Sequence, residues 1–110
     1  MSLRTLLVVS AAGFMAAAGT SHAQVTGNAT RGKAYAEQLC SDCHRTGREG
    51  PASADPKAPP FTAVAKTRGM SAMALGVWLQ TTHPTMPSIL LKPATMDDII
   101  AYILSLREAP

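Results

Sequence analysis

The feature that most constrains this chain is the pentad C40-S41-D42-C43-H44, which contains its only two cysteines. Side chains three and four positions apart lie on one face of a helical turn. Cys40, Cys43 and His44 therefore present two thiols and an imidazole to the same side. The two thiols can bond to the two vinyl groups of one haem while the imidazole reaches the iron. Because Cys-x-x-Cys-His is the attachment motif of c-type haem, the pentad predicts one covalently bound haem c with His44 as an iron ligand.

Three other uses of the cysteine pair explain less of the pattern. A thioredoxin-like dithiol needs a βαβ setting, and the chain has no strand-like alternating run. A structural zinc site needs four ligands at paired spacing, whereas His22 and His83 have no partner beside them. A disulfide between Cys40 and Cys43 would leave His44 without a role.

The N-terminus has the three parts of a secretory signal peptide. Arg4 precedes an apolar stretch over residues 6–18, and Ser21-His22-Ala23 offers a cleavage site. The apolar stretch is shorter than the about 20 residues that a membrane-spanning helix needs. We therefore expect removal of residues 1–23 and export of one domain, residues 24–110, to the bacterial periplasm, with no integral membrane span.

Size and charge limit the partners of this domain. So short a chain has a thin core, which a large apolar cofactor would complete. The formal net charge is +3 at pH 7, and no dense run of Lys and Arg is present, so nucleic acid is not an expected partner. The mildly basic N-terminal half could steer an acidic redox partner, although an ordinary solvated surface explains the same charges.

Helical periodicity interrupted by turn residues predicts a small all-α domain of three to four helices. The expected helices cover residues 29–43, 61–66, 72–82 and 95–107. Glycines and prolines place residues 45–60 in a loop, and prolines keep residues 83–94 non-helical.

Capping residues and apolar faces refine these helices. Asn28 and Ser71 are placed to cap the first and third, and Thr95 with Asp98 resembles a capping box for the last. Met73 lies within the third helix, where a methionine usually packs in the core. Each of the last two helices has one face predicted to be buried: Leu75, Trp78, Leu79 and Thr82 in the third, and Ile99, Tyr102, Ile103 and Leu106 in the fourth.

Four features in order resemble the class I cytochrome c family, in its short monohaem bacterial form. They are Gly32 in a helix leading to the pentad, the sequence A58-P59-P60-F61, the sequence H83-P84-T85-M86-P87, and I99-I100-A101-Y102-I103 in the last helix. The resemblance covers essentially all of residues 24–110. It implies helices folded around one covalent haem and an electron-transfer protein rather than an enzyme, with no catalytic residues.

The sixth position on the iron decides between carrier and catalyst. The candidate methionines are Met70, Met73, Met86 and Met96. The resemblance implies Met86, and Pro84 and Pro87 would stiffen its loop by fixing φ on both sides. A methionine ligand raises the reduction potential. His83 is the alternative and would give a lower potential.

The resemblance also implies residues that support the site. The second ring nitrogen of His44 is expected to donate to the carbonyl of Pro59, with Pro60 as the alternative, because ligating histidines are generally held in this way. Phe61 is expected to pack on the haem face.

Trp78 is expected against the haem or a propionate, or else in the general core. Lys66 or Arg68 is a candidate propionate partner. Gly32 and Tyr102 are expected to meet where the first and last helices cross.

The sequence therefore predicts a periplasmic, monomeric carrier of single electrons between a redox-protein donor and acceptor, one of which could be a dehydrogenase. One alternative is a dedicated haem subunit of a periplasmic dehydrogenase or oxidase complex. Another is a haem enzyme or gas sensor with an open sixth site.

Overall fold

The computed structural model describes residues 25–83 and 85–108, so the expected signal peptide, residues 1–23, lies outside the described residues. Over these ranges the chain forms four α-helices and no β-strand: α1 (Ala29–Leu39), α2 (Phe61–Lys66), α3 (Ala72–Gln80) and α4 (Pro93–Ser105). The predicted all-α fold is thus confirmed. None of these described helices has the length and apolar character needed to cross a membrane.

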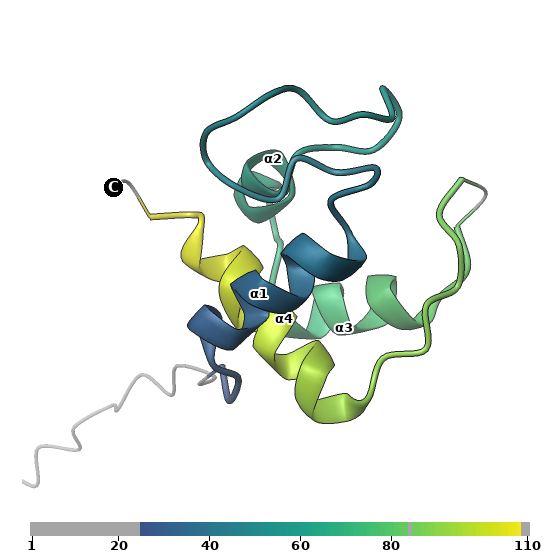
Figure 1. The fold of residues 1–110 in the computed structure, drawn as a ribbon. Helices are drawn as coiled ribbons and strands as arrows, with labels where there is room; N and C mark the ends of the chain where they lie inside the picture. Colours follow the sequence, from purple (N-terminus) through teal and green to yellow (C-terminus); the bar gives the residue numbers. More distant parts are fainter. Residues whose placement is uncertain (1–24, 84, 109–110) are drawn as a thin grey trace, which may run out of the picture.

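Helix α4 is the centre of the fold, because α1, α2 and α3 all pack against it. Figure 1 shows α1 crossing α4, with the loop over residues 45–60 arching above α2. The predicted apolar face of α4 is buried in the core: Ile99, Tyr102, Ile103 and Leu106. Side chains from each of the other helices complete this core: Ala36, Phe61, Ala65 and Leu75.

The crossing of α1 and α4 depends on Gly32. A Cβ at this position would overlap the carbonyl oxygen of Asp98 and lie 2.8 Å from the Cβ of Tyr102. Only a residue without a side chain allows the two helices to approach so closely. The predicted meeting of Gly32 and Tyr102 is therefore confirmed.

Helix α4 begins differently from the prediction. Its first residue is Pro93 and its N-cap is Lys92, with no side-chain cap, so the capping box of Thr95 and Asp98 was wrong. Proline suits the first helical position, because its φ is already helical and its missing N–H has no intrahelical partner there. The helix therefore starts two residues early, which moves Asp98 into its second turn.

From this position Asp98 reaches across to the start of α1. Its carboxylate accepts hydrogen bonds from the backbone N–H of Asn28 at 2.6 Å and from the Arg31 side chain at 2.8 and 3.0 Å. The Arg31 hydrogen bond, followed by that from Asn28, holds the pKa of Asp98 below its ordinary value. A buried carboxylate thus links the two crossing helices.

Two other helices end earlier than predicted. Helix α1 ends at Leu39 rather than residue 43, because Cys40 leaves helical geometry at φ −120° and ψ −18°. Helix α3 ends at Gln80 rather than Thr82, because Thr81 is extended at φ −105° and ψ 144°. The proline at position 84 disfavours helix in the residue before it, which is consistent with this early end.

Helix α4 also ends earlier than predicted, at Ser105 rather than residue 107, with Leu106 as its C-cap. The predictions for α2 and for the caps of α1 and α3 are confirmed. Helix α2 has the predicted bounds. The side chain of Asn28 accepts from the N–H of Arg31 at 2.9 Å, and that of Ser71 accepts from the N–H of Ala74 at 3.1 Å. Both caps satisfy backbone donors that have no partner inside the helix.

Two side chains fasten the 45–60 loop to the end of α4. The hydroxyl of Tyr102 donates to the carbonyl of Thr46 at 2.7 Å in a buried setting. The guanidinium of Arg48 donates to the carbonyls of Ser105 at 3.0 Å and Leu106 at 3.1 Å. These bonds hold the start of the loop, and with it the chain that follows the pentad, on the helical core.

Candidate haem-binding site

The pentad forms a separate turn after α1. The N–H of His44 donates to the carbonyl of Cys40 at 2.9 Å, and that of Cys43 donates to the same carbonyl at 3.2 Å. Cys40 is half-buried against the core and Cys43 is exposed; both thiols are free. Burial raises the pKa of the Cys40 thiol. The turn therefore keeps the predicted i, i+3, i+4 relation even though α1 has already ended.

The imidazole of His44 is held by the far end of the 45–60 loop. Its Nδ1 lies 2.7 Å from the carbonyl oxygen of Pro59. A carbonyl can only accept, so Nδ1 carries the proton and Nε2 keeps its lone pair. The hydrogen bond predicted for Pro59 is thus present, and it selects the tautomer that can bind a metal through Nε2.

Phe61 and Pro60 have different parts in this arrangement. The ring of Phe61 is buried and packs on His44, with centroids 5.3 Å apart and planes tilted by 50°. Pro60 is the N-cap of α2, and its carbonyl accepts from the N–H groups of Ala63 and Val64. The histidine is consequently fixed by a carbonyl and by an aromatic ring.

A cavity of about 350 Å³ lies between the end of α1, helix α3 and the chain that connects α3 to α4. Cys40, Trp78 and Met86 line it together with apolar side chains that include Leu39, Leu79, Leu91, Met96 and Ile99. Cys43, His44, Pro59 and Phe61 are not among the lining residues. The pentad turn joins Cys43 and His44 to Cys40, and Pro59 and Phe61 contact His44. The structure thus brings three predicted site residues to one cavity and connects the other four to Cys40 through these contacts.

The exposure of α3 corrects one sequence prediction. Leu75 is buried and Leu79 partly buried, as predicted, but Trp78 is 55% exposed. Thr82 is exposed and lies beyond the end of the helix. The indole of Trp78 faces the cavity rather than the core, which is why the helical pattern alone misplaced it.

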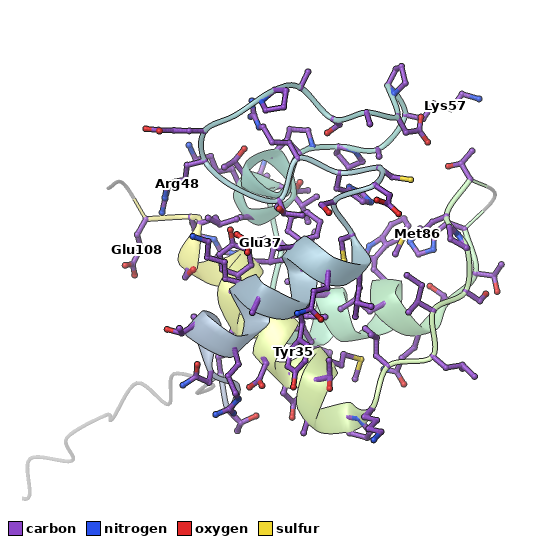
Figure 2. The ribbon with its side chains drawn as sticks, viewed as in Figure 1. Tyr35, Glu37, Arg48, Lys57, Met86 and Glu108 are labelled. Atoms are coloured by element: carbon purple, nitrogen blue, oxygen red, sulfur yellow. The ribbon has the colours of Figure 1, made fainter. Side chains whose placement is uncertain are left out.

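Met86 lies on the loop that follows α3 (Figure 2), where it is half-buried and lines the cavity. Its N–H donates to the carbonyl of His83 at 3.3 Å. His83 does not line the cavity: its ring packs on Trp78 with centroids 4.5 Å apart, and its Nδ1 lies 2.7 Å from the carbonyl of Thr81.

The other methionines occupy different surroundings. Met70 and Met96 pack against the core, and Met96 also lines the cavity. Met73 is 81% exposed, so its predicted core packing was wrong. It lies two residues before the buried Leu75, which places it on the opposite face of α3.

The donor set fits a c-type haem and not a structural zinc ion. A thiol and a thioether border an apolar cavity, and the pentad turn joins to that thiol a histidine whose hydrogen-bonded nitrogen is Nδ1, not Nε2. Within residues 25–83 and 85–108, no group of three or more His, Cys, Asp or Glu side chains is placed to hold a metal ion. A flat apolar cofactor would also cover Leu39 and Trp78, which are large apolar side chains exposed at the cavity.

Sequence reasoning missed several cavity residues. Leu39, Leu91 and Ile89 line the cavity although no motif marks them. The available signal was position: Leu39 directly precedes the pentad, and the other two lie in the chain that carries Met86.

These features are those of a small c-type cytochrome domain. The family model described as Cytochrome c matches residues 29–107, and the chain belongs to this family. No curated protein and no solved structure matched the chain. Membership implies covalently bound haem c and a role in electron transfer.

Proposed function

We propose that this protein is a periplasmic monohaem cytochrome that carries single electrons between redox proteins. In this proposal Cys40 and Cys43 form the thioether bonds, and His44 and Met86 are the axial ligands. The observation that supports this proposal is that one cavity is lined by both Cys40 of the pentad turn and Met86, while Pro59 sets the tautomer of His44 in that turn.

When bound, haem supplies an iron that changes by one electron between its ferric and ferrous states. The chain's part is to hold the ligands still. The Pro59 carbonyl orients the imidazole and increases its basicity, and the Phe61 ring packs on it. The thioether of Met86 favours ferrous iron, which raises the potential. If His44 and Met86 both bind the iron, the protein itself would supply both ligands, and we therefore propose electron transfer rather than catalysis on a bound substrate.

The surroundings of His83 support Met86 as the second ligand. The Nδ1 of His83 is occupied by the Thr81 carbonyl, and the ring lies on Trp78 outside the cavity lining. Ligation by His83 would require its ring to leave Trp78 and turn into the cavity. Met86 needs no comparable movement, because it already lines the cavity.

Location and partners follow from the sequence. The signal-like residues 1–23 support export, and cytochrome c domains are typically found outside the cytoplasm. We expect one haem, since the pentad contains the only two cysteines, and we propose that the free protein is a monomer. The partners are expected to be protein electron donors and acceptors.

The test combines covalent attachment with ligand identity. The haem should remain with the protein after acid–acetone extraction and should be lost from the variant carrying both Cys40→Ala and Cys43→Ala. The ferric protein should show the weak sulfur-to-iron band at the red end of its spectrum. Met86→Ala should abolish that band and permit fast carbon monoxide binding to the ferrous protein.

Two results would contradict the proposal. Extractable haem would refute covalent attachment through the pentad. Fast carbon monoxide binding to the unsubstituted protein would refute the six-coordinate carrier and favour an enzyme or sensor with an open site.

A further inference from the structure

His83 is held in one orientation by two contacts. Its ring packs on Trp78 of α3, with centroids 4.5 Å apart and planes tilted by 44°. Its Nδ1 lies 2.7 Å from the carbonyl oxygen of Thr81, and since a carbonyl only accepts, Nδ1 is the donor. A packed ring with a fixed nitrogen has little rotational freedom left.

The backbone of His83 is in turn joined to Met86. The N–H of Met86 donates to the carbonyl of His83 at 3.3 Å, and the two residues form an isolated antiparallel bridge. A second contact closes the same loop further out, where the hydroxyls of Thr82 and Ser88 lie 3.3 Å apart. The position of Met86 therefore depends on where His83 is anchored.

The residue on which the His83 ring packs, Trp78, is joined to the helical core. Trp78 belongs to α3, which packs on α4 through the buried Leu75. A continuous chain of contacts thus runs from the core to Met86 through the rings of Trp78 and His83. By contrast Thr85, in the same connection, is exposed and does not line the cavity.

We propose that His83 is a positioning residue, whose packing on Trp78 and hydrogen bond to Thr81 keep the Met86 sulfur in place as an iron ligand. The inference rests on the proposed axial role of Met86. A thioether is an uncharged ligand on a flexible side chain, so the backbone that carries it must be restrained for the bond to persist. The Trp78 packing and the Thr81 hydrogen bond of His83, together called the clamp, supply this restraint without His83 touching the iron.

The experiment measures how fast excess imidazole replaces Met86 in the ferric holoprotein. At saturating imidazole the replacement rate equals the rate at which Met86 leaves the iron. His83→Phe keeps a ring for Trp78 but removes the donor, His83→Asn keeps a donor but removes the ring, and His83→Ala removes both. Thr85→Ala is the matched control on the same connection, because Thr85 is exposed and does not line the cavity.

All three His83 variants should keep the red sulfur band in the absence of imidazole. His83→Ala should exchange at least about two- to tenfold faster than the parent, the factor for loss of the aromatic pair alone, and loss of the Thr81 hydrogen bond should add to it. His83→Phe and His83→Asn should exchange at rates between those of His83→Ala and the parent, and Thr85→Ala should exchange at the parent rate. A general loss of stability would not separate the ring from the donor in this way.

Met86→Ala distinguishes failure of this inference from failure of the proposed function. If Met86→Ala removes the sulfur band while His83→Ala exchanges at the parent rate, the axial assignment stands and the clamp is overturned. If Met86→Ala leaves the band unchanged, the axial assignment is wrong and the clamp falls with it. If His83→Ala itself loses the low-spin spectrum, His83 is a ligand and both are overturned.

Discussion

Replacing Tyr102 with phenylalanine tests how firmly the 45–60 loop is joined to the helical core. The Tyr102 hydroxyl donates to the Thr46 carbonyl at 2.7 Å, and both residues are buried. Tyr102→Phe leaves that carbonyl without its partner and without water, which costs about 1–3 kcal/mol. In a domain of this size about 1 kcal/mol lowers the melting temperature by roughly 4–8 °C. We expect a decrease in melting temperature of between about 4 and 24 °C.

Thermal unfolding of the holoprotein followed by circular dichroism measures this decrease. Tyr35→Phe is the matched control, because Tyr35 lies half-buried on α1 (Figure 2) and its hydroxyl has no hydrogen bond among the described residues. The control should change the free energy of unfolding by no more than about 0.5 kcal/mol. Equal melting temperatures for Tyr102→Phe and Tyr35→Phe would refute the idea that the Thr46 contact contributes to stability.

Two further predictions concern the crossing of α1 and α4. Gly32→Ala should prevent native folding or lower the melting temperature by more than Tyr102→Phe does, because the added Cβ would overlap the Asp98 carbonyl. Gly47→Ala is the control in circular dichroism, because a Cβ added there would have no atom nearer than 3.5 Å. The ionisation of Asp98 should make the free energy of unfolding depend on pH. Since its pKa is lowered in the folded state, its contribution is present above the unfolded value of about 3.9 and is lost as pH falls through the folded value. Urea unfolding at several acidic pH values should show this loss in the parent and not in Asp98→Asn; an identical pH dependence in both would contradict it.

The sequence predicted those parts of the fold that local chemistry decides. The pentad, the caps at Asn28 and Ser71, and the apolar face of α4 depend on residues close together in the chain. The Pro59 contact was predicted only through the family resemblance, because it joins two ends of a loop 15 residues apart in sequence. Sequence spacing alone does not determine where such a loop returns.

The errors arose where a tertiary contact outweighed a local pattern. Thr95 and Asp98 have the spacing of a capping box, but Pro93 begins the helix first and Asp98 binds Arg31 of another helix. In α3, helical periodicity assigned Trp78 to the same buried face as Leu75. Periodicity identifies a face but not what covers it, and a cofactor cavity is lined by the same residue types as a core.

Because a core and a cofactor cavity are lined by the same residue types, the apolar side chains of this domain bear on both its folding and its function. Tyr102 and Phe61 are buried by protein, whereas Trp78 is left 55% exposed on a helix whose neighbouring Leu75 is buried. Exposing a large ring is unfavourable by roughly 25 cal/mol per Å² of apolar surface, so a small domain gains stability if a cofactor covers it. In the proposed arrangement the same covering would bring haem against the segment that carries Met86. Completion of the core and placement of the second ligand would then be consequences of one packing event, in which Trp78 contacts the cofactor on one side and His83 on another.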